Sequence, residues 1–285
     1  MDMIIRNLIE DEVRQLVRWA ESEGWNPGVD DAALFWNLDP QGYLGIEIED
    51  QMIGGGAIIK HNSMFGFMGL FIVDPEFRGK KLGTKLWFAR RDRLLDRLDQ
   101  NGTIGLDGVD DMVPFYEKGG FKQYTRHRRF ELATPPSPSS APTEVQELNE
   151  LDFEKIQELD RQCFPGERAE YLKSWIHQAG HVSLGITDGT KVTGFGVMRP
   201  CQTGWKIGPL FADDISIADQ LFLAFCQRAE SKSVYLDAPD NNPAARELCE
   251  RHQMEEVFGC VRMYLGPVPE LANQKIFGIT TLEVG

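Results

Sequence analysis

Positively charged residues and glycines follow directly after a short apolar run in the first half of the chain. The run is residues 70–73, and Gly79 and Gly83 come a few positions later. Glycine lets the backbone approach a ligand closely, and the first N–H groups of a helix that begins near Leu82 have no partner within that helix. Such a strand, turn and helix start are suited to bind a pyrophosphate, and four cations surround them: Arg78, Lys80, Lys81 and Lys85.

An ordinary strand–turn–helix, whose glycines serve only the turn, is the simpler interpretation of the same residues. Two other phosphate-binding motifs are excluded, because the segment contains neither Gly-x-x-x-x-Gly-Lys-Ser/Thr nor Gly-x-Gly-x-x-Gly. A second segment favours ligand binding. A strand-like run at 103–107 precedes Pro114-Phe115-Tyr116-Glu117-Lys118, and the glycine directly after Lys118 is typical of a helix end.

These two segments, in this order, resemble the cofactor-binding motifs of the GNAT acetyltransferases. The family loop follows a strand ending in Val-x-Pro and has the pattern Arg/Gln-x-x-Gly-x-Gly/Ala, which Val73, Pro75, Arg78 and Gly83 match. Lys81 stands in place of the first motif glycine, a departure that still leaves its backbone N–H available. The resemblance implies acetyl-coenzyme A as co-substrate, bound by Phe71, Ile72, Val73, Arg78, Gly79, Lys80, Lys81, Leu82, Gly83 and Thr84.

The resemblance also implies how an acetyl group would be transferred to an amine. Backbone N–H groups of residues 71–73 would polarise the thioester carbonyl. Tyr116 is the expected general acid, because the pKa of a tyrosine, about 10, lies above that of the departing thiol, about 8.5. Packing is the alternative role for Tyr116.

The general base is left open between several carboxylates. Asp107, at the end of its strand, is the first candidate. The others are Asp110, Asp111, Glu47 and Glu49. Gly69 falls where some relatives carry a base on the fourth strand, so that device is not expected here. The loop after the first amphipathic segment covers the acceptor side in the family, and its Trp25 and Asn26 are expected either to bind the acceptor or to anchor the loop.

Composition limits the classes of function. The chain has 285 residues, 42% hydrophobic and 26% charged, as in a globular protein of one or two domains. Its formal net charge of −14 disfavours nucleic acid and mildly favours a cationic acceptor. No membrane-spanning run or secretory leader is seen, so no membrane partner is expected. Five cysteines without Cys-x-x-Cys spacing favour neither disulfides nor a metal site and fit a cytoplasmic protein.

The chain is expected to contain two copies of one plan. Residues 133–142 hold four prolines and three serines, the composition of an extended linker, so the predicted domains are 1–132 and 143–285. Similar strings recur in the same order on both sides of this linker, which indicates an internal repeat. The matching strings are 44–46 with 184–186, 54–57 with 194–197, and 104–107 with 234–237.

The second copy lacks the phosphate-binding features of the first. Its equivalent strand leads into Asp213, Asp214 and Asp219, which would repel an anion, and Cys249 matches the position of Tyr116. Its end resembles the degenerate C-terminal domain of YitH-like tandem acetyltransferases. We therefore expect the α/β (α+β) class: two tandem GNAT-like domains, each a mixed, mainly antiparallel sheet flanked by helices, with the cofactor bound only by the first.

Three functions are compatible with these features. The preferred one is an N-acetyltransferase that moves an acetyl group directly to a small-molecule or peptide amine in the first domain, without a metal. The second domain would then shape the acceptor pocket or form an interface, such as that of a homodimer. The alternatives are a transferase for a longer acyl group or a protein amine, and a non-catalytic acetyl-coenzyme A sensor.

Overall fold

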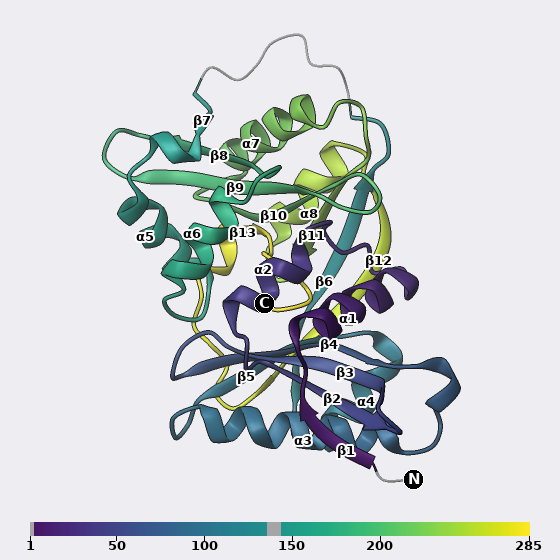
Figure 1. Ribbon diagram of the computed structural model, residues 1–285. Helices are drawn as coiled ribbons and strands as arrows, with labels where there is room; N and C mark the ends of the chain where they lie inside the picture. The colour runs from purple at the N-terminus through teal and green to yellow at the C-terminus, as the bar shows by residue number, and fades with distance from the viewer. Residues whose placement is uncertain (1–2, 136–143) are drawn as a thin grey trace. The chain divides into compact units, whose positions relative to one another are not determined.

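The computed structural model describes residues 3–135 and 144–285, and this part of the chain forms two compact units (Figure 1). Unit 1 comprises Met1–Gln123, Met263–Val268 and Leu282–Gly285, and unit 2 comprises Tyr124–Arg262 and Pro269–Thr281. Most of the predicted linker lies outside the described residues. Each unit thus combines segments from both sides of the predicted linker. The predicted domains, 1–132 and 143–285, do not include this crossing.

Unit 1 is built on a mainly antiparallel sheet. Its strands follow the order β1 (Met3–Asn7), β2 (Tyr43–Ile48), β3 (Gln51–Lys60), β4 (Phe65–Val73) and β5 (Thr103–Gly108), and the end of β12 (Glu255–Leu265) lies next to β5. The pairs from β1 to β4 are antiparallel. β4 and β5 are parallel. The helix α3 (Leu82–Arg97) lies between them in the chain and carries the chain back to the end of the sheet where β4 begins, so that β5 runs in the same direction as β4.

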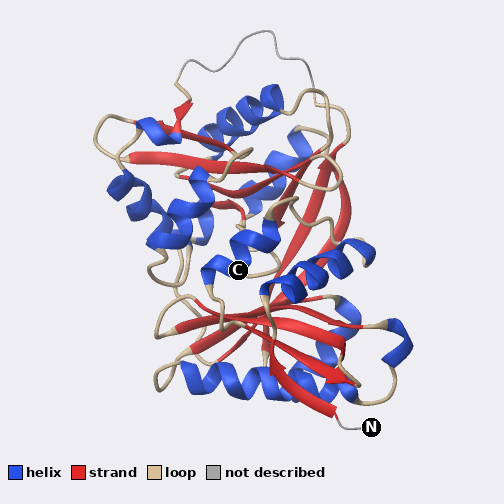
Figure 2. Cartoon of the chain, viewed as in Figure 1, coloured by secondary structure: helices blue, strands red, loops and turns tan. Residues whose placement is uncertain are grey.

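Helices cover both faces of the unit 1 sheet (Figure 2). α1 (Glu10–Ser22) and α2 (Asp31–Leu38) lie on one face, and α3 lies on the other. The short helix α4 (Val113–Lys118) follows the 3-10 turn η2 (Asp110–Met112) after β5. α1 forms against the sheet because its apolar residues recur at helical spacing and are buried: Val13, Leu16, Val17 and Ala20.

Unit 2 repeats this plan. Its sheet has the order β6 (Lys122–Leu132), β11 (Val234–Pro239), β10 (Trp205–Ala212), β9 (Val192–Pro200), β8 (Val182–Thr187) and β7 (Gln146–Glu147). The short strand β13 (Ile276–Gly278) pairs with β10. Four helices complete the unit: α5 (Phe153–Cys163), α6 (Ala169–His177), α7 (Ile215–Arg228) and α8 (Pro243–Arg251).

The registers of the two sheets confirm the internal repeat. Gly45 of β2 pairs with Gly55 of β3, and Gly185 of β8 pairs with Phe195 of β9 at the same sequence offset. In each unit the central parallel pair, β4 with β5 or β10 with β11, is connected through the helix that begins just after the first strand. The predicted fold class, a mixed and mainly antiparallel sheet flanked by helices, is therefore confirmed.

Candidate functional site

The two central strands of unit 1 separate where the sequence predicts cofactor binding. β4 and β5 pair from Phe65 with Thr103 to Met68 with Leu106, and both strands then continue past the last recorded pair. We call the opening between residues 69–73 of β4 and 107–108 of β5 the unit 1 fork. Within the described chain β4 has only β3 and β5 as strand neighbours, so the edge of residues 71–73 that faces the fork can pair with an extended ligand.

The turn after β4 leads to a helix start whose N-cap residue, in the part of the chain that the structure describes, makes no side-chain cap. The 3-10 turn η1 (Pro75–Phe77) follows β4, and Gly79 then has φ 76°. Lys81, the residue before α3, has φ 61°, and within the described residues its side chain makes no capping hydrogen bond. Glycine adopts this left-handed backbone without strain, which explains why the motif favours glycine at the place of Lys81. The first N–H groups of α3 present the positive end of the helix dipole.

Gly83 holds the first turn of α3 against the end of β4. A Cβ atom at Gly83 would lie 3.2 Å from Val73 Cγ2 and 3.4 Å from Phe71 Cζ. A larger side chain would therefore push the helix start away from the strand. This close approach joins the predicted pyrophosphate turn to the predicted thioester-binding strand.

The cations of the predicted loop surround this helix start and are exposed. Arg78 Nε donates a hydrogen bond to the Val73 carbonyl at 2.8 Å, and the Arg78 guanidinium also pairs with Glu23. The Lys80 ammonium lies 4.9 Å from the centre of the Phe77 ring. The exposed members of the predicted set are Arg78, Gly79, Lys80, Lys81 and Thr84, whereas Leu82 and Gly83 are half-buried.

The predicted acid and base lie at the same end of β5. The Tyr116 ring is stacked on Trp87 of α3 at a centroid distance of 5.8 Å, and the residue is 8% exposed. A Cβ atom at Gly108 would approach Tyr116 Cε2 to 2.5 Å, so the glycine makes room for the ring against β5. Asp107 precedes Gly108, is half-buried and is the first β5 residue beyond the last recorded pair with β4. Both residues therefore border the unit 1 fork.

The other candidate bases have structural surroundings that differ from those of Asp107. Arg6 Nε donates to Glu47 at 2.6 Å, and Arg6 Nη1 donates to Glu12 at 2.8 Å. The hydrogen bond from Arg6 is the main cause that holds the pKa of Glu12 below its usual value. Glu47 is thus part of an ion network between β1, α1 and β2, and Glu49 is exposed in the following turn.

Trp25 and Asn26 lie on the loop between α1 and α2, and both are half-buried. The backbone N–H of Trp25 donates to the Ala20 carbonyl at 3.0 Å, and the backbone of Asn26 is left-handed, with φ 50°. Glu23, the partner of Arg78, is the first residue of this loop. The loop predicted to cover the acceptor therefore begins beside the predicted phosphate-binding turn.

A segment that the sequence analysis did not assign to the site comes from the far end of the chain. A Cβ atom at Gly69 would overlap the backbone of Glu283, so the segment Leu282–Gly285 lies directly against β4 in unit 1. The Val284 carbonyl lies 2.7 Å from His61 Nε2. Glu283 is 3% exposed, and its backbone lies next to Gly69, the position at which no base on the fourth strand is expected. No local motif near Glu283 could have indicated this placement.

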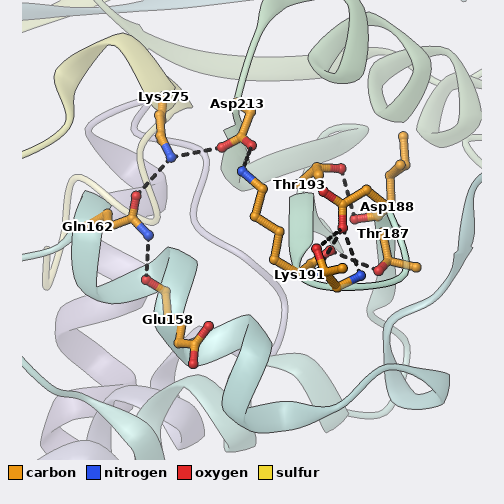
Figure 3. Close-up of polar contacts among 10 residues, drawn as sticks. Glu158, Gln162, Thr187, Asp188, Lys191, Thr193, Asp213 and Lys275 are labelled. Atoms are coloured by element: carbon orange, nitrogen blue, oxygen red, sulfur yellow. Dashed lines mark hydrogen bonds and ion pairs between the residues drawn. The ribbon is translucent and has the colours of Figure 1, made fainter.

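The equivalent helix start in unit 2 is closed by its own side chains. The Asp214 carboxylate accepts hydrogen bonds from Ser216 N at 2.8 Å and Ile217 N at 3.0 Å, so it occupies the first N–H groups of α7. Asp213 binds Lys191 Nζ at 2.5 Å and Lys275 Nζ at 2.8 Å. Figure 3 shows both lysines converging on this carboxylate.

The fork of unit 2 is filled by the chain itself. β10 and β11 pair only from Trp205 with Val234 to Ile207 with Leu236, and β13 then pairs with β10 at Leu210 and Phe211. The N–H of Ile279, directly after β13, donates to the Asp237 carbonyl of β11 at 3.0 Å. Lys275, directly before β13, is the residue that Asp213 binds, and it also donates to Gln162 at 2.8 Å.

The unit 2 residue that matches Tyr116 has no comparable chemistry. Cys249 is fully buried in α8, and burial raises the pKa of its thiol to about 12. Within residues 3–135 and 144–285 no cluster of three or more potential metal ligands is found. The same residues include no helix that is long and apolar enough to cross a membrane.

Comparisons with known proteins agree with the geometry of both units. Family models described as "Acetyltransferase (GNAT) domain" match residues 23–132 and, separately, residues 156–278. The chain is 28% identical to the holothin acyltransferase of Pseudoalteromonas sp. (strain SANK 73390) over 269 residues, which cover 94% of this chain and 89% of the relative.

Two solved structures share the fold over nearly the whole chain. One is a protein from Pyrococcus horikoshii assigned as an acetyltransferase, with a TM-score of 0.85 and 24% identity, covering 99% of this chain and 96% of that chain. The other is a tandem GNAT protein from the clavulanic acid biosynthesis pathway, with a TM-score of 0.65 and 13% identity, covering 94% of this chain and 100% of that chain. The two family matches, the relative and the repeated fold show that the chain is an acyltransferase of the GNAT family with two GNAT domains in tandem.

Proposed function

We propose that unit 1 transfers an acetyl group from acetyl-coenzyme A to the amine of a small molecule or peptide. The observation that carries this proposal is the open unit 1 fork beside the uncapped, cationic start of α3, because unit 2 closes both features with its own residues. Negative charge on a pyrophosphate is favoured at such a helix start. An extended pantetheine arm is suited to the strand edge at residues 71–73.

Each part of unit 1 has a role in the proposed transfer. Backbone N–H groups at the unit 1 fork stabilise the negative charge that develops on the thioester oxygen. Tyr116 donates a proton to the departing thiolate, and its packing on Trp87 fixes the ring at the mouth of the fork. The exposed cations and the α3 N-terminus bind the phosphates, and Trp25 with Asn26 contributes to the acceptor side.

Two carboxylates are candidates for the general base that takes the proton of the amine. Asp107 ends β5 beside Tyr116, and Glu283 lies against Gly69 of β4. Asp107→Asn and Glu283→Gln keep the shape of each side chain and remove its basicity. The variant that loses turnover identifies the base. Its loss should be largest below neutral pH, and an acceptor amine of lower pKa should relieve it.

Unit 2 is proposed to bind no acetyl-coenzyme A and to support the acceptor side of the enzyme. Its fork is filled by β13, and the Asp214 carboxylate occupies the N–H groups that a phosphate would need. Asp213 holds Lys275 beside β13, which fixes the strand in place. Unit 2 therefore has the GNAT fold without the openings that acetyl-coenzyme A requires.

The test is release of the coenzyme A thiol from acetyl-coenzyme A in the presence of a panel of amines. We expect turnover with at least one amine and a drop in kcat of about 100-fold in Tyr116→Phe, with nearly unchanged affinity for the co-substrate. Tyr235→Phe, a matched change in unit 2, should leave kcat unchanged. Equal turnover by Tyr116→Phe and wild type would contradict the role of Tyr116 as the acid.

A longer acyl group or another acceptor is the second candidate, and the relative named holothin acyltransferase is the reason to consider it. The same assay with acyl-coenzyme A esters of increasing chain length, and with holothin among the acceptors, separates it from acetyl transfer to other amines. A sensor would bind acetyl-coenzyme A without turnover for any member of these panels.

A further inference from the structure

Arg90 is a cation in the interior of unit 1. In the sequence, the basic stretch 78–97 is compatible with phosphate binding or, for Arg90 and Arg93, with an exposed helix face. An exposed position is wrong for Arg90, which is 1% exposed. Arg93, one turn further along α3, is exposed as expected. The guanidinium of Arg90 lies over Gly56, where a Cβ atom would come within 2.6 Å of its Nε atom. Glycine at position 56 therefore makes the space for this side chain.

The Arg90 guanidinium binds a β-bulge in β4. Ala57 of β3 pairs with Gly69, and Gly55 pairs with Ile72, so Gly56 alone is opposite both Leu70 and Phe71. Leu70 has φ 49°, a left-handed conformation that is strained for a leucine. Arg90 Nη2 donates to the Ala57 carbonyl at 2.5 Å and to the Gly69 carbonyl at 2.7 Å. Its Cζ atom also lies 5.1 Å from the centre of the Phe71 ring.

This bulge lies where the unit 1 fork opens. Met68 is the last β4 residue that pairs with β5, and the two bulge residues, Leu70 and Phe71, follow within three positions. Arg90 therefore fixes the backbone at the start of the edge that the acyl carbonyl is proposed to approach. Arg90 also interacts electrostatically with Tyr116, which places its charge near the proposed acid.

A buried cation is costly, and among the described residues the hydrogen bonds of Arg90 go to backbone carbonyls and not to a carboxylate. Within the described residues its Nε and Nη1 atoms have no hydrogen-bond partner. Burial lowers the pKa of the Arg90 guanidinium to about 9, which still leaves it charged at neutral pH. Its two hydrogen bonds to the backbone carbonyls of Ala57 and Gly69 offset part of this cost.

Unit 2 has a β-bulge between the matching strands, one position along from that of unit 1. The register between β9 and β10 shifts by one residue opposite Val197, between Ile207 and Leu210. Gly196 matches Gly56, and a Cβ atom there would lie 2.9 Å from the Phe225 ring of α7. Phe225 thus occupies in unit 2 the place of Arg90 in unit 1. The helix side chain that packs on the matching glycine is therefore apolar in unit 2 and cationic in unit 1.

We propose that Arg90 is a positioning residue for acyl transfer. This proposal rests on the proposed function of unit 1. It holds the Gly69 carbonyl so that the backbone N–H groups of the bulge face the acyl carbonyl, and it adds positive charge behind them. Its effect is therefore specific to the acyl carbonyl and differs from general binding of coenzyme A.

Binding of two ligands by calorimetry tests this specificity. Acetyl-coenzyme A has the carbonyl oxygen, and S-ethyl-coenzyme A has the same chain length without it. We expect Arg90→Met to lower the preference for acetyl-coenzyme A over S-ethyl-coenzyme A by about 10-fold or more and to leave affinity for S-ethyl-coenzyme A within about 3-fold. Arg90→Lys should recover part of the preference, and Arg93→Met should retain all of it. An unchanged preference in a folded Arg90→Met protein would overturn the proposal.

Hydrogen exchange of the unliganded protein gives a readout that does not depend on ligand binding. Arg90→Met should speed the exchange of amides at residues 69–72 relative to the rest of unit 1, and Arg93→Met should not. Equal protection of these amides in wild type and Arg90→Met would overturn the positioning role. Failure of wild type to bind either ligand would instead contradict the proposed function, which keeps the two failures distinguishable.

Discussion

The helices α3 and α7 begin at equivalent places in the two units, but their N-termini differ in chemistry. α3 follows a left-handed lysine and, in the described chain, has no side-chain cap, whereas α7 is capped by the Asp214 carboxylate. Four exposed cations lie near the start of α3: Arg78, Lys80, Lys81 and Lys85. Near the start of α7, Asp213 is bound by two lysines. The proposed function assigns this place at α3 to an anion of the ligand, whereas α7 supplies the anion from its own chain.

The two forks differ in the same way. β13 pairs with β10 beyond Ile207 and follows the edge of that strand. In unit 1, among the described strands, only β3 pairs with residues 69–73 of β4. The second unit therefore shows which kind of group the shared fold accepts at this place, namely an extended chain that pairs with the strand edge. Among the described residues, the same fold therefore carries either an internal paired strand or no paired strand at this edge.

The largest expected effect follows from truncating a buried side chain of the segment that fills the unit 2 fork. Phe277 of β13 is fully buried in the unit 2 core, so Phe277→Ala should lower the free energy of unfolding of unit 2 by about 3–5 kcal/mol. Denaturant unfolding measures this loss, and acetyl-coenzyme A should not restore it. A loss below about 1 kcal/mol would show that β13 is not an integral part of unit 2.

A smaller effect is expected from opening the start of α7. Asp214→Ala removes the acceptor for Ser216 N and Ile217 N, which should destabilise unit 2 by about 1 kcal/mol. Lys81→Ala at the start of α3 is the matched control and should cost less, because Lys81 makes no capping hydrogen bond within the described residues. Equal losses in the two variants would contradict the difference between the helix starts.

Relief of backbone strain at the α3 start should have a modest effect of opposite sign. Lys81→Gly removes the side chain from a residue with φ 61° and should stabilise unit 1 by about 0.5 kcal/mol, after the greater chain entropy of glycine is included. Thermal unfolding measures the gain. The motif glycine would then be restored, and the affinity for acetyl-coenzyme A should stay within about 3-fold of wild type because the backbone N–H is retained. Destabilisation by Lys81→Gly would contradict the assigned strain.

The smallest effect concerns acid stability of the β8–β9 hairpin in unit 2. Hydrogen bonds from the N–H groups of Lys191 and Thr190, with one from the Thr190 hydroxyl, lower the pKa of Asp188 to about 2. Because this value lies below the unfolded pKa of about 4, the carboxylate stabilises the fold above that pH and loses its effect as the pH falls toward about 2. The difference in Tm between wild type and Asp188→Asn should therefore be present at neutral pH and vanish near pH 2.

Local sequence features predicted much of this architecture. Gly79 and Gly83 beside an apolar strand located the turn, and the repeated strings located the matching hairpins of both units, because turn chemistry and strand patterns act over short distances. The aspartates of the second copy also indicated its altered helix start. In the structure, Asp214 caps that helix and Asp213 binds two lysines. The charge of the two residues is the same, so it could not predict which of them has which role.

Features that depend on distant parts of the chain could not be predicted. Arg90 has the local pattern of a solvent-facing helix residue, and only the packing of β3 and β4 against α3 shows that it is buried. Glu283 reaches β4 from the end of the chain, and β13 fills the unit 2 fork from a segment with no strand-like neighbours in sequence. Likewise, β6 belongs mostly to unit 2 because it pairs with β11, and the end of β12 belongs to unit 1 because it lies next to β5.

Calorimetric titration of acetyl-coenzyme A into three proteins tests the central claim most directly. Gly83 and Ser216 are the second residues of α3 and α7, so Gly83→Glu and Ser216→Glu place the same anion at equivalent positions of the two units. We expect one site per chain in wild type and Ser216→Glu, and a loss of affinity of about 100-fold in Gly83→Glu, the size expected for an unpaired charge at a binding site. Two sites per chain, or a loss caused by Ser216→Glu and not by Gly83→Glu, would contradict it.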